Sequence, residues 1–69
     1  MESSEIDLRF TYHSPKPGQP EMYVKIRDQA KELANLINDF CMESREKNLA
    51  FTELETAVFW ANAAIARRG

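Results

Sequence analysis

Basic and aromatic side chains are the residues of this sequence whose types and spacing could do chemistry. Five of the nine basic residues fall in two groups, one within two turns of a predicted helix and one near the last residue: Lys25, Arg27, Lys31, Arg67 and Arg68. Tyr12 adds an aromatic ring beside a proline-rich loop. Guanidinium and ammonium groups bind phosphate oxygens, and an aromatic ring stacks on a nucleobase. The set suits a ligand with phosphates and bases, although Asp28 and Glu32 could pair with the same cations on a solvated helix face.

Residues that could carry out catalysis are few. The sequence has one cysteine, Cys41, and one histidine, His13, so a structural zinc site lacks its usual four nitrogen and sulfur ligands. With two glycines, it also lacks a glycine-rich phosphate loop. We expect Cys41 to pack on an apolar stripe, His13 to make a polar surface or ligand contact, and Glu53 and Glu55 to be solvated. The sequence therefore predicts a protein that is not an enzyme and that holds no metal and no cofactor.

Two amphipathic helices are predicted to position these side chains. Pro20 suits the first position of a helix, and beyond it apolar residues recur at spacings of three and four, which predicts a first helix over residues 20–42. Ser44 is the predicted N-cap of a second helix over residues 44–68. Because two helices of near-equal length are joined by about two residues, they should form an antiparallel hairpin.

The segment before the first helix, residues 1–19, is predicted to be an arm followed by a loop. Its apolar residues occupy every second position: Ile6, Leu8, Phe10 and Tyr12. This alternation favours an extended arm over residues 6–12, while a helical turn beginning at Ser3 or Ser4 is an alternative. Residues 13–20 contain all three prolines and a glycine, so they should form a loop.

The length of the chain indicates self-association. A compact monomer of 8.0 kDa would expose roughly 4,500 Å² and bury about 60% of its unfolded surface. Such burial does little more than offset the entropy of ordering the chain, and a single cysteine provides no intramolecular disulfide. The second helix is apolar nearly all round from Ala57 to Ala66, so it needs partners on every side. We therefore predict an all-α fold, a helical hairpin forming one domain over residues 1–69 and assembled into a homo-oligomer.

Composition also excludes several partners. No apolar run approaches the length of about 20 residues that a membrane-spanning helix needs, so we expect no membrane partner. The first residues are acidic and polar, unlike a signal peptide, and the lone cysteine suits a reducing cytoplasm. With a sequence pI near 5.3, the chain is not expected to bind DNA or RNA polymers.

Four stretches of the sequence together resemble a phage protein family. They are the Phe-Thr-Tyr-His run at residues 10–13 with its proline-rich loop, residues 26–34, residues 44–47, and the Trp-Ala-Asn-Ala-Ala-Ile-Ala-Arg run at residues 60–67. These stretches are similar to the small hairpin proteins of the anti-CBASS and Thoeris anti-defence sponges, over about residues 8–67. The last run is the most specific part of the resemblance.

The resemblance implies a function as well as a fold. Members of the cyclic-nucleotide branch are all-helical homohexamers that sequester bacterial immune messengers without cleaving them, so that the CBASS effector is not activated. Cyclic dinucleotides occupy pockets between protomers, and cyclic trinucleotides occupy separate pockets near the three-fold axis. The implied location is the cytoplasm of the infected bacterial host. The Thoeris branch adds a cyclic ADP-ribose isomer and often carries extra sequence, which this short chain lacks.

Site residues carried over by the resemblance fall into two sets. The implied cyclic-dinucleotide site has a base-stacking tyrosine, its neighbouring histidine and basic residues of the first helix: Tyr12, His13, Lys25, Arg27 and Lys31. Among the basic residues Arg27 is the best match, and the two lysines are neighbouring candidates because loop length shifts the register. The implied trinucleotide contact is Arg67. Arg68, which stands where a neutral residue is expected, is its possible substitute.

A second hypothesis belongs to another functional class. The same features fit a helical, oligomeric protein–protein adaptor that docks on a host factor. A messenger-degrading enzyme is a third and weaker hypothesis, because no nucleophile and base are paired in the sequence.

Overall fold

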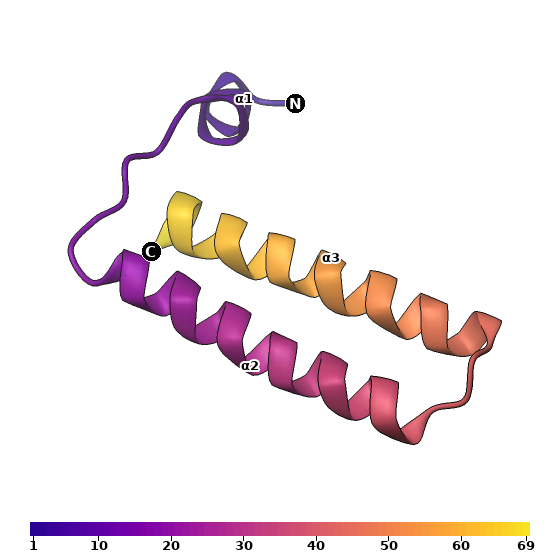
Figure 1. Ribbon diagram of the computed structural model, residues 1–69. Helices are drawn as coiled ribbons and strands as arrows, with labels where there is room; N and C mark the ends of the chain where they lie inside the picture. The colour runs from indigo at the N-terminus through magenta and orange to yellow at the C-terminus, as the bar shows by residue number, and fades with distance from the viewer.

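The computed structural model describes all 69 residues and is entirely helical. It contains α1 (Ser3–Phe10), α2 (Gln19–Phe40) and α3 (Arg45–Arg68), with no strand. In Figure 1, α2 and α3 lie side by side as an antiparallel hairpin, and α1 lies near the end where α3 finishes. The all-α class and the helical hairpin are therefore confirmed. None of the three helices combines the length and the apolar character that a membrane span requires.

The N-terminal arm differs from the expected extended segment. Residues Ser3–Phe10 form an α-helix, so the alternative with a helical turn at Ser3 describes the structure and the extended interpretation is wrong. The physical reason lies in residues four apart: Arg9 Nε donates to Glu5 Oε1 at 3.0 Å, an i,i+4 pair that stabilises a helix. An extended arm would also need a neighbouring strand, and the fold has none.

The bounds of the two long helices follow from their caps. Gly18 adopts a left-handed conformation (φ 85°) before α2, which begins one residue earlier than expected, at Gln19. The helix ends at Phe40, because Cys41 is extended and only its backbone N–H returns to Ile37 O at 3.0 Å. Cys41 is exposed, so the expectation that it packs on the apolar stripe is wrong. Residues 41–44 form a longer connection than predicted.

Ser44 is the N-cap of α3, as its position in the sequence predicts. Its side-chain oxygen accepts from the Lys47 backbone N–H at 3.1 Å, which satisfies one of the free donors of the first turn. Glu46 in the first turn and Arg67 and Arg68 in the last turn match the charges that the helix dipole favours.

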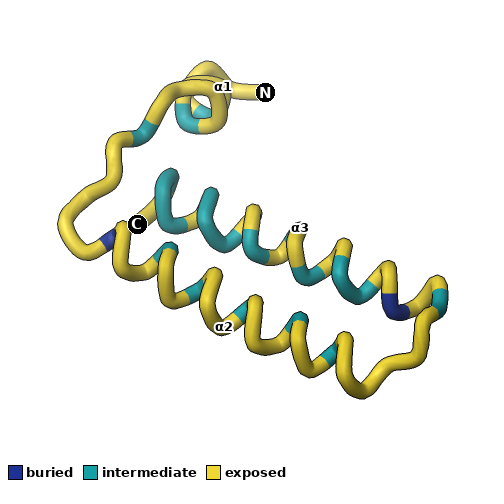
Figure 2. The backbone as a smooth tube through the Cα atoms, in the orientation of Figure 1, coloured by how far each residue is buried: buried dark blue, intermediate teal, exposed yellow.

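The chain has no apolar core of its own. No hydrophobic residue is fully buried, and the two buried residues, Gln19 and Lys47, are polar. Figure 2 shows them as the only dark segments, at opposite ends of the hairpin. The accessible surface is 5684 Å², against roughly 4,500 Å² for a compact monomer of this mass. The radius of gyration is 15.3 Å, against about 11 Å for a compact domain of this length.

Both ends of the hairpin are closed by a buried polar side chain that binds the neighbouring helix. At one end Gln19 Nε2 donates to Ile65 O at 3.0 Å, near the end of α3. At the other end Lys47 Nζ donates to Asn38 O at 3.2 Å, near the end of α2. The last carbonyl groups of a helix can lack intrahelical donors, and the bond from Lys47 supplies one to Asn38 O. Ile65 O already accepts from the Gly69 backbone N–H at 3.1 Å, so Gln19 adds a second donor there. The bonds from Gln19 and Lys47 also fix the register of α2 against α3.

Candidate functional site

The linker between α1 and α2, residues 11–18, passes the end of the hairpin where α3 finishes (Figure 1). A hollow of about 620 Å³ lies there. Residues of α1, the linker, α2 and α3 all contribute to its wall: Arg9, Thr11, Tyr12, His13, Tyr23, Arg27, Asn62, Ala63, Ala66 and Arg67. We call it the tyrosine–arginine pocket. It gathers residues that are more than 50 positions apart in the sequence, so it exists only in the folded hairpin.

The linker contributes Tyr12 and His13 to this pocket. The Nε2–H of His13 donates to the Leu8 carbonyl oxygen at 2.7 Å, which ties the linker back to α1. A carbonyl oxygen only accepts, so Nε2 carries the proton and a neutral His13 leaves Nδ1 as an acceptor. Tyr12 is 81% exposed, so its ring is open for stacking.

From α2 the pocket receives Tyr23 and Arg27. These residues are four positions apart, which places them on one face of the helix, one turn above the other. Tyr23 is half-buried and supplies a second aromatic ring. The pair therefore offers a ring and a guanidinium from a rigid element.

On the α3 side the pocket wall has small residues beside one amide. Ala63 and Ala66 carry only a methyl group, so a ligand can approach the helix closely there. The Asn62 Oδ1 oxygen is buried and has no hydrogen-bond partner. Leaving such an acceptor unpaired costs about 1–3 kcal/mol. The wall thus holds one unmatched polar group.

The charged side chains that line the pocket are positive, although Glu5 outside the lining pairs with Arg9. Three guanidinium groups, those of Arg9, Arg27 and Arg67, line it, and no carboxylate does. Guanidinium groups bind phosphate through paired N–H donors, and the two tyrosine rings can stack on bases. The arrangement can therefore hold a ligand that has several phosphates and at least one base.

The sequence of residues 2–66 matches the family described as Acb2/Tad1, hairpin domain. The chain belongs to this family. It is the family of anti-CBASS and anti-Thoeris sponges, so the resemblance drawn from the sequence is confirmed. No curated protein and no solved structure matches the chain. The matched range contains nearly the whole tyrosine–arginine pocket and ends at Ala66, directly before Arg67.

The structure brings together four of the seven residues that membership of the Acb2/Tad1 family implied for ligand binding: Tyr12, His13, Arg27 and Arg67. The other three lie elsewhere in this chain. Lys31 lines a groove of about 520 Å³ between α2 and α3. Arg68 donates to Glu5 Oε1 at 3.3 Å and lines a smaller recess of about 280 Å³.

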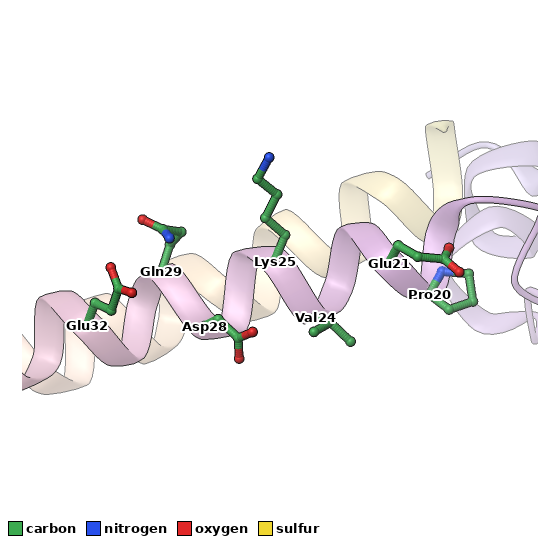
Figure 3. Close-up of a pocket in the computed structure, with 7 residues that line it drawn as sticks. All are labelled: Pro20, Glu21, Val24, Lys25, Asp28, Gln29 and Glu32. Atoms are coloured by element: carbon green, nitrogen blue, oxygen red, sulfur yellow. The ribbon is translucent and has the colours of Figure 1, made fainter.

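Lys25, the remaining residue, lies on the outward face of α2. A hollow of about 490 Å³ lies there, lined by residues of α2 alone. Figure 3 shows Lys25 and Gln29 extending from one side of the helix. Three carboxylates and a single ammonium group line this hollow, the carboxylates being those of Glu21, Asp28 and Glu32. Its net negative charge repels phosphate, so this face is a poor phosphate site by itself.

Sequence reasoning did not find the other six residues that line the pocket, and three of them carry a charged, aromatic or amide side chain: Arg9, Tyr23 and Asn62. Tyr23 belongs to the residues that recur at spacings of three and four along the first helix, and its spacing of four from Arg27 was a usable signal. Asn62 is the one polar side chain within the run from Ala57 to Ala66, which also marked it. Arg9 could not be placed, because the arm was expected to be extended.

Proposed function

We propose that this member of the Acb2/Tad1 family binds cyclic oligonucleotide messengers and sequesters them intact, which blocks activation of the CBASS effector. The observation that carries the proposal is the tyrosine–arginine pocket, where three arginines and two tyrosines surround one hollow without a carboxylate. A cyclic dinucleotide has two phosphates and two bases, and the pocket offers a complementary group for each.

The side chains that line the pocket and the neighbouring recess have distinct roles. Tyr12 stacks on a base of the cyclic dinucleotide, and His13 lies beside it with Nδ1 available as an acceptor. Arg27 donates to a phosphate. We assign contacts with cyclic trinucleotides to Arg67 and, in its place or together with it, Arg68.

The proposal includes assembly into a homo-oligomer, with a hexamer as the expected state. It is supported by the lack of a buried apolar core and by an accessible surface about 1,200 Å² larger than that of a compact monomer. Lys25 and Lys31 lie outside the tyrosine–arginine pocket of their own chain. They serve a bound ligand across a subunit boundary, where the pockets of neighbouring chains meet.

Sequestration without cleavage agrees with the distance between Cys41, the one thiol that could act as a nucleophile, and His13, the one imidazole that could act as its base. Cys41 follows the end of α2 and His13 precedes its start, so the helix of about 33 Å separates the two side chains. A nucleophile and its base must lie within hydrogen-bond reach. Binding alone requires no such pair.

Isothermal titration calorimetry tests the function directly. The ligands are a panel of 3′,3′-cyclic dinucleotides together with cyclic tri-adenylate, and we expect saturable binding of at least one of them. Mass spectrometry of the supernatant after heat denaturation should recover the ligand at its original mass. Absence of saturable heat with every member would contradict the proposal.

The adaptor hypothesis makes a different prediction for the chain when it is purified from host cells. A host protein should then co-purify with the chain in stoichiometric amount, and heat denaturation should release no nucleotide. Recovery of a cleaved ligand would instead indicate the enzyme hypothesis.

A further inference from the structure

Helix α1 lies apart from the hairpin and is held to it by few contacts. Figure 1 shows it near the end of α3, connected to α2 only by the linker. None of its residues is buried. A single hydrogen bond joins α1 to the hairpin, from Arg68 of α3 to Glu5 Oε1 at 3.3 Å.

The same carboxylate oxygen also binds Arg9 within α1. Arg9 Nε donates to Glu5 Oε1 at 3.0 Å, so one oxygen holds guanidinium groups from two helices. Around this point lies the recess of about 280 Å³, lined by Glu5, Arg9, Phe10, Trp60, Arg67 and Arg68. Arg9 and Arg67 line both the recess and the tyrosine–arginine pocket, so they form the wall between them.

This geometry leaves Arg9 oriented for a ligand. A guanidinium carries five N–H donors in a planar fork. Glu5 engages the Nε–H of Arg9, while the four donors on the terminal nitrogens make no hydrogen bond within the chain. A carboxylate that binds one edge of a guanidinium in this way fixes the direction of the other edge.

We propose that Glu5 is a positioning residue for the tyrosine–arginine pocket. Through Arg68 it docks α1 on α3, and through Arg9 it aims a guanidinium at the pocket. The docked helix in turn sets where the linker starts, and therefore where Tyr12 and His13 stand. This role rests on the proposed binding of cyclic oligonucleotides.

The size of the effect follows from the weakness of exposed ion pairs. Glu5 is about one-third exposed, and the side chains of Arg9 and Arg68 are more exposed still. Such pairs stabilise the docked position of α1 only slightly. Removal of the Glu5 charge should therefore shift the docking equilibrium of α1 by a small factor toward the undocked state. The apparent affinity then falls in proportion to the docked fraction. We expect Glu5→Gln to weaken binding about two- to fivefold.

The experiment compares Glu5→Gln with Asp7→Asn, the matched acid-to-amide change on the same helix. Asp7 is exposed and makes no ion pair. Calorimetry with the best-bound cyclic dinucleotide should show the expected loss for Glu5→Gln and none for Asp7→Asn, with the melting temperature of both unchanged. The ratio of wild-type to Glu5→Gln affinity should approach one at 1 M salt, because the screening length falls to about 3 Å.

Hydrogen exchange of the ligand-free protein supplies an independent measurement. Amides of residues 5–10 should exchange faster in Glu5→Gln than in the wild type and in Asp7→Asn. Unchanged exchange overturns the docking contact, and equal affinity of Glu5→Gln and wild type overturns the positioning role. If the wild type binds no messenger, the proposed function fails, and the exchange result still decides whether Glu5 holds α1.

Discussion

Single residues of the tyrosine–arginine pocket differ in how firmly the chain holds them. Arg27 lies in the interior of α2, where the helix fixes its backbone. Tyr12 lies on the linker, held by the bond from its neighbour His13 to Leu8. If the pocket binds a ligand as proposed, the ligand meets a cation whose backbone is already fixed on one side and a ring on the linker on the other. Ordering a side chain on binding reduces the affinity that its contacts would otherwise give.

Substitution of Tyr12 tests its stacking role. Tyr12→Ala should lower the affinity for cyclic dinucleotides by about 5- to 150-fold, the equivalent of roughly 1–3 kcal/mol per stacked base. Tyr12→Phe keeps the aromatic face and should bind nearly as well as the wild type. Titration calorimetry measures both variants, and a Tyr12→Ala protein with undiminished affinity would refute the assignment.

At the scale of helices, the caps and the external carbonyl bonds determine how α2 and α3 are held. Ser44 begins α3, and Lys47 in its first turn reaches the end of α2. Lys47 Nζ also lies 2.6 Å from Glu43 Oε1, so the buried ammonium group has a counter-charge. The connection between the helices is thus stabilised by polar contacts rather than by apolar packing.

Removal of the cap should destabilise the hairpin. Ser44→Ala leaves the Lys47 N–H without its acceptor at the start of α3, and we expect a loss of about 1 kcal/mol in the free energy of unfolding. Chemical denaturation followed by circular dichroism measures the change. Ser14→Ala in the linker, where the hydroxyl makes no hydrogen bond, is the control and should leave the midpoint unaltered.

Docking of α1 on α3 through Glu5 should depend on pH. The hydrogen bond from Arg9, with further help from the charge of Arg68, holds the pKa of Glu5 below its ordinary value of 4.5. A lowered pKa means that the contribution of this carboxylate is complete above pH 4.5 and is lost as the pH falls through the lowered pKa.

Trp60 reports on this transition because it lines the same recess and is the only tryptophan. Its emission should stay constant from neutral pH down to about 5 and change below that value. The difference between the pH profiles of Trp60 emission in the wild type and in Glu5→Gln separates the contribution of Glu5 from that of the other carboxylates. Identical profiles for the two proteins would show that Glu5 does not hold α1.

Helix existence could be predicted from the sequence, whereas the composition of the pocket could be predicted only in part. The helices follow from spacings of three and four and from the cap at Ser44. Both signals involve residues that are close in the sequence, so they can be recognised without knowledge of the fold. The state of α1 depended on a competition between an alternating pattern and the Glu5–Arg9 pair, which the pattern alone did not decide. The meeting of Arg27 with Asn62 depends on the register of two helices, which is fixed by Gln19 and Lys47 at their ends.

The whole molecule is a flat layer rather than a globule, with principal extents of 45 × 30 × 12 Å. Its outer surface carries large apolar side chains on α2 of which about half or more is exposed: Leu33, Leu36 and Phe40. A specific interface buries about 800 Å² on each partner, and the excess surface of this chain exceeds that amount. The shape therefore favours association of several copies.

The oligomeric state can be tested on this apolar face. Sedimentation should give a mass that is a multiple of 8.0 kDa, about 48 kDa for the expected hexamer, and the melting temperature should rise with protein concentration. Leu36→Arg places a charge on the face and should lower the mass, whereas Asn35→Arg on the neighbouring polar position should not. A wild type that sediments at 8.0 kDa at all concentrations would refute assembly.

Gln19 and Lys47 bind backbone carbonyl oxygens of Ile65 and Asn38, which has a consequence for engineering. Every amino acid supplies a carbonyl group, so the two acceptors survive whatever side chain occupies those positions. The frame can therefore be kept while the side chains around the hollow are randomised. A library of variants with Gln19 and Lys47 held constant could be screened for binding of new nucleotide ligands, because its members should keep the hairpin fold.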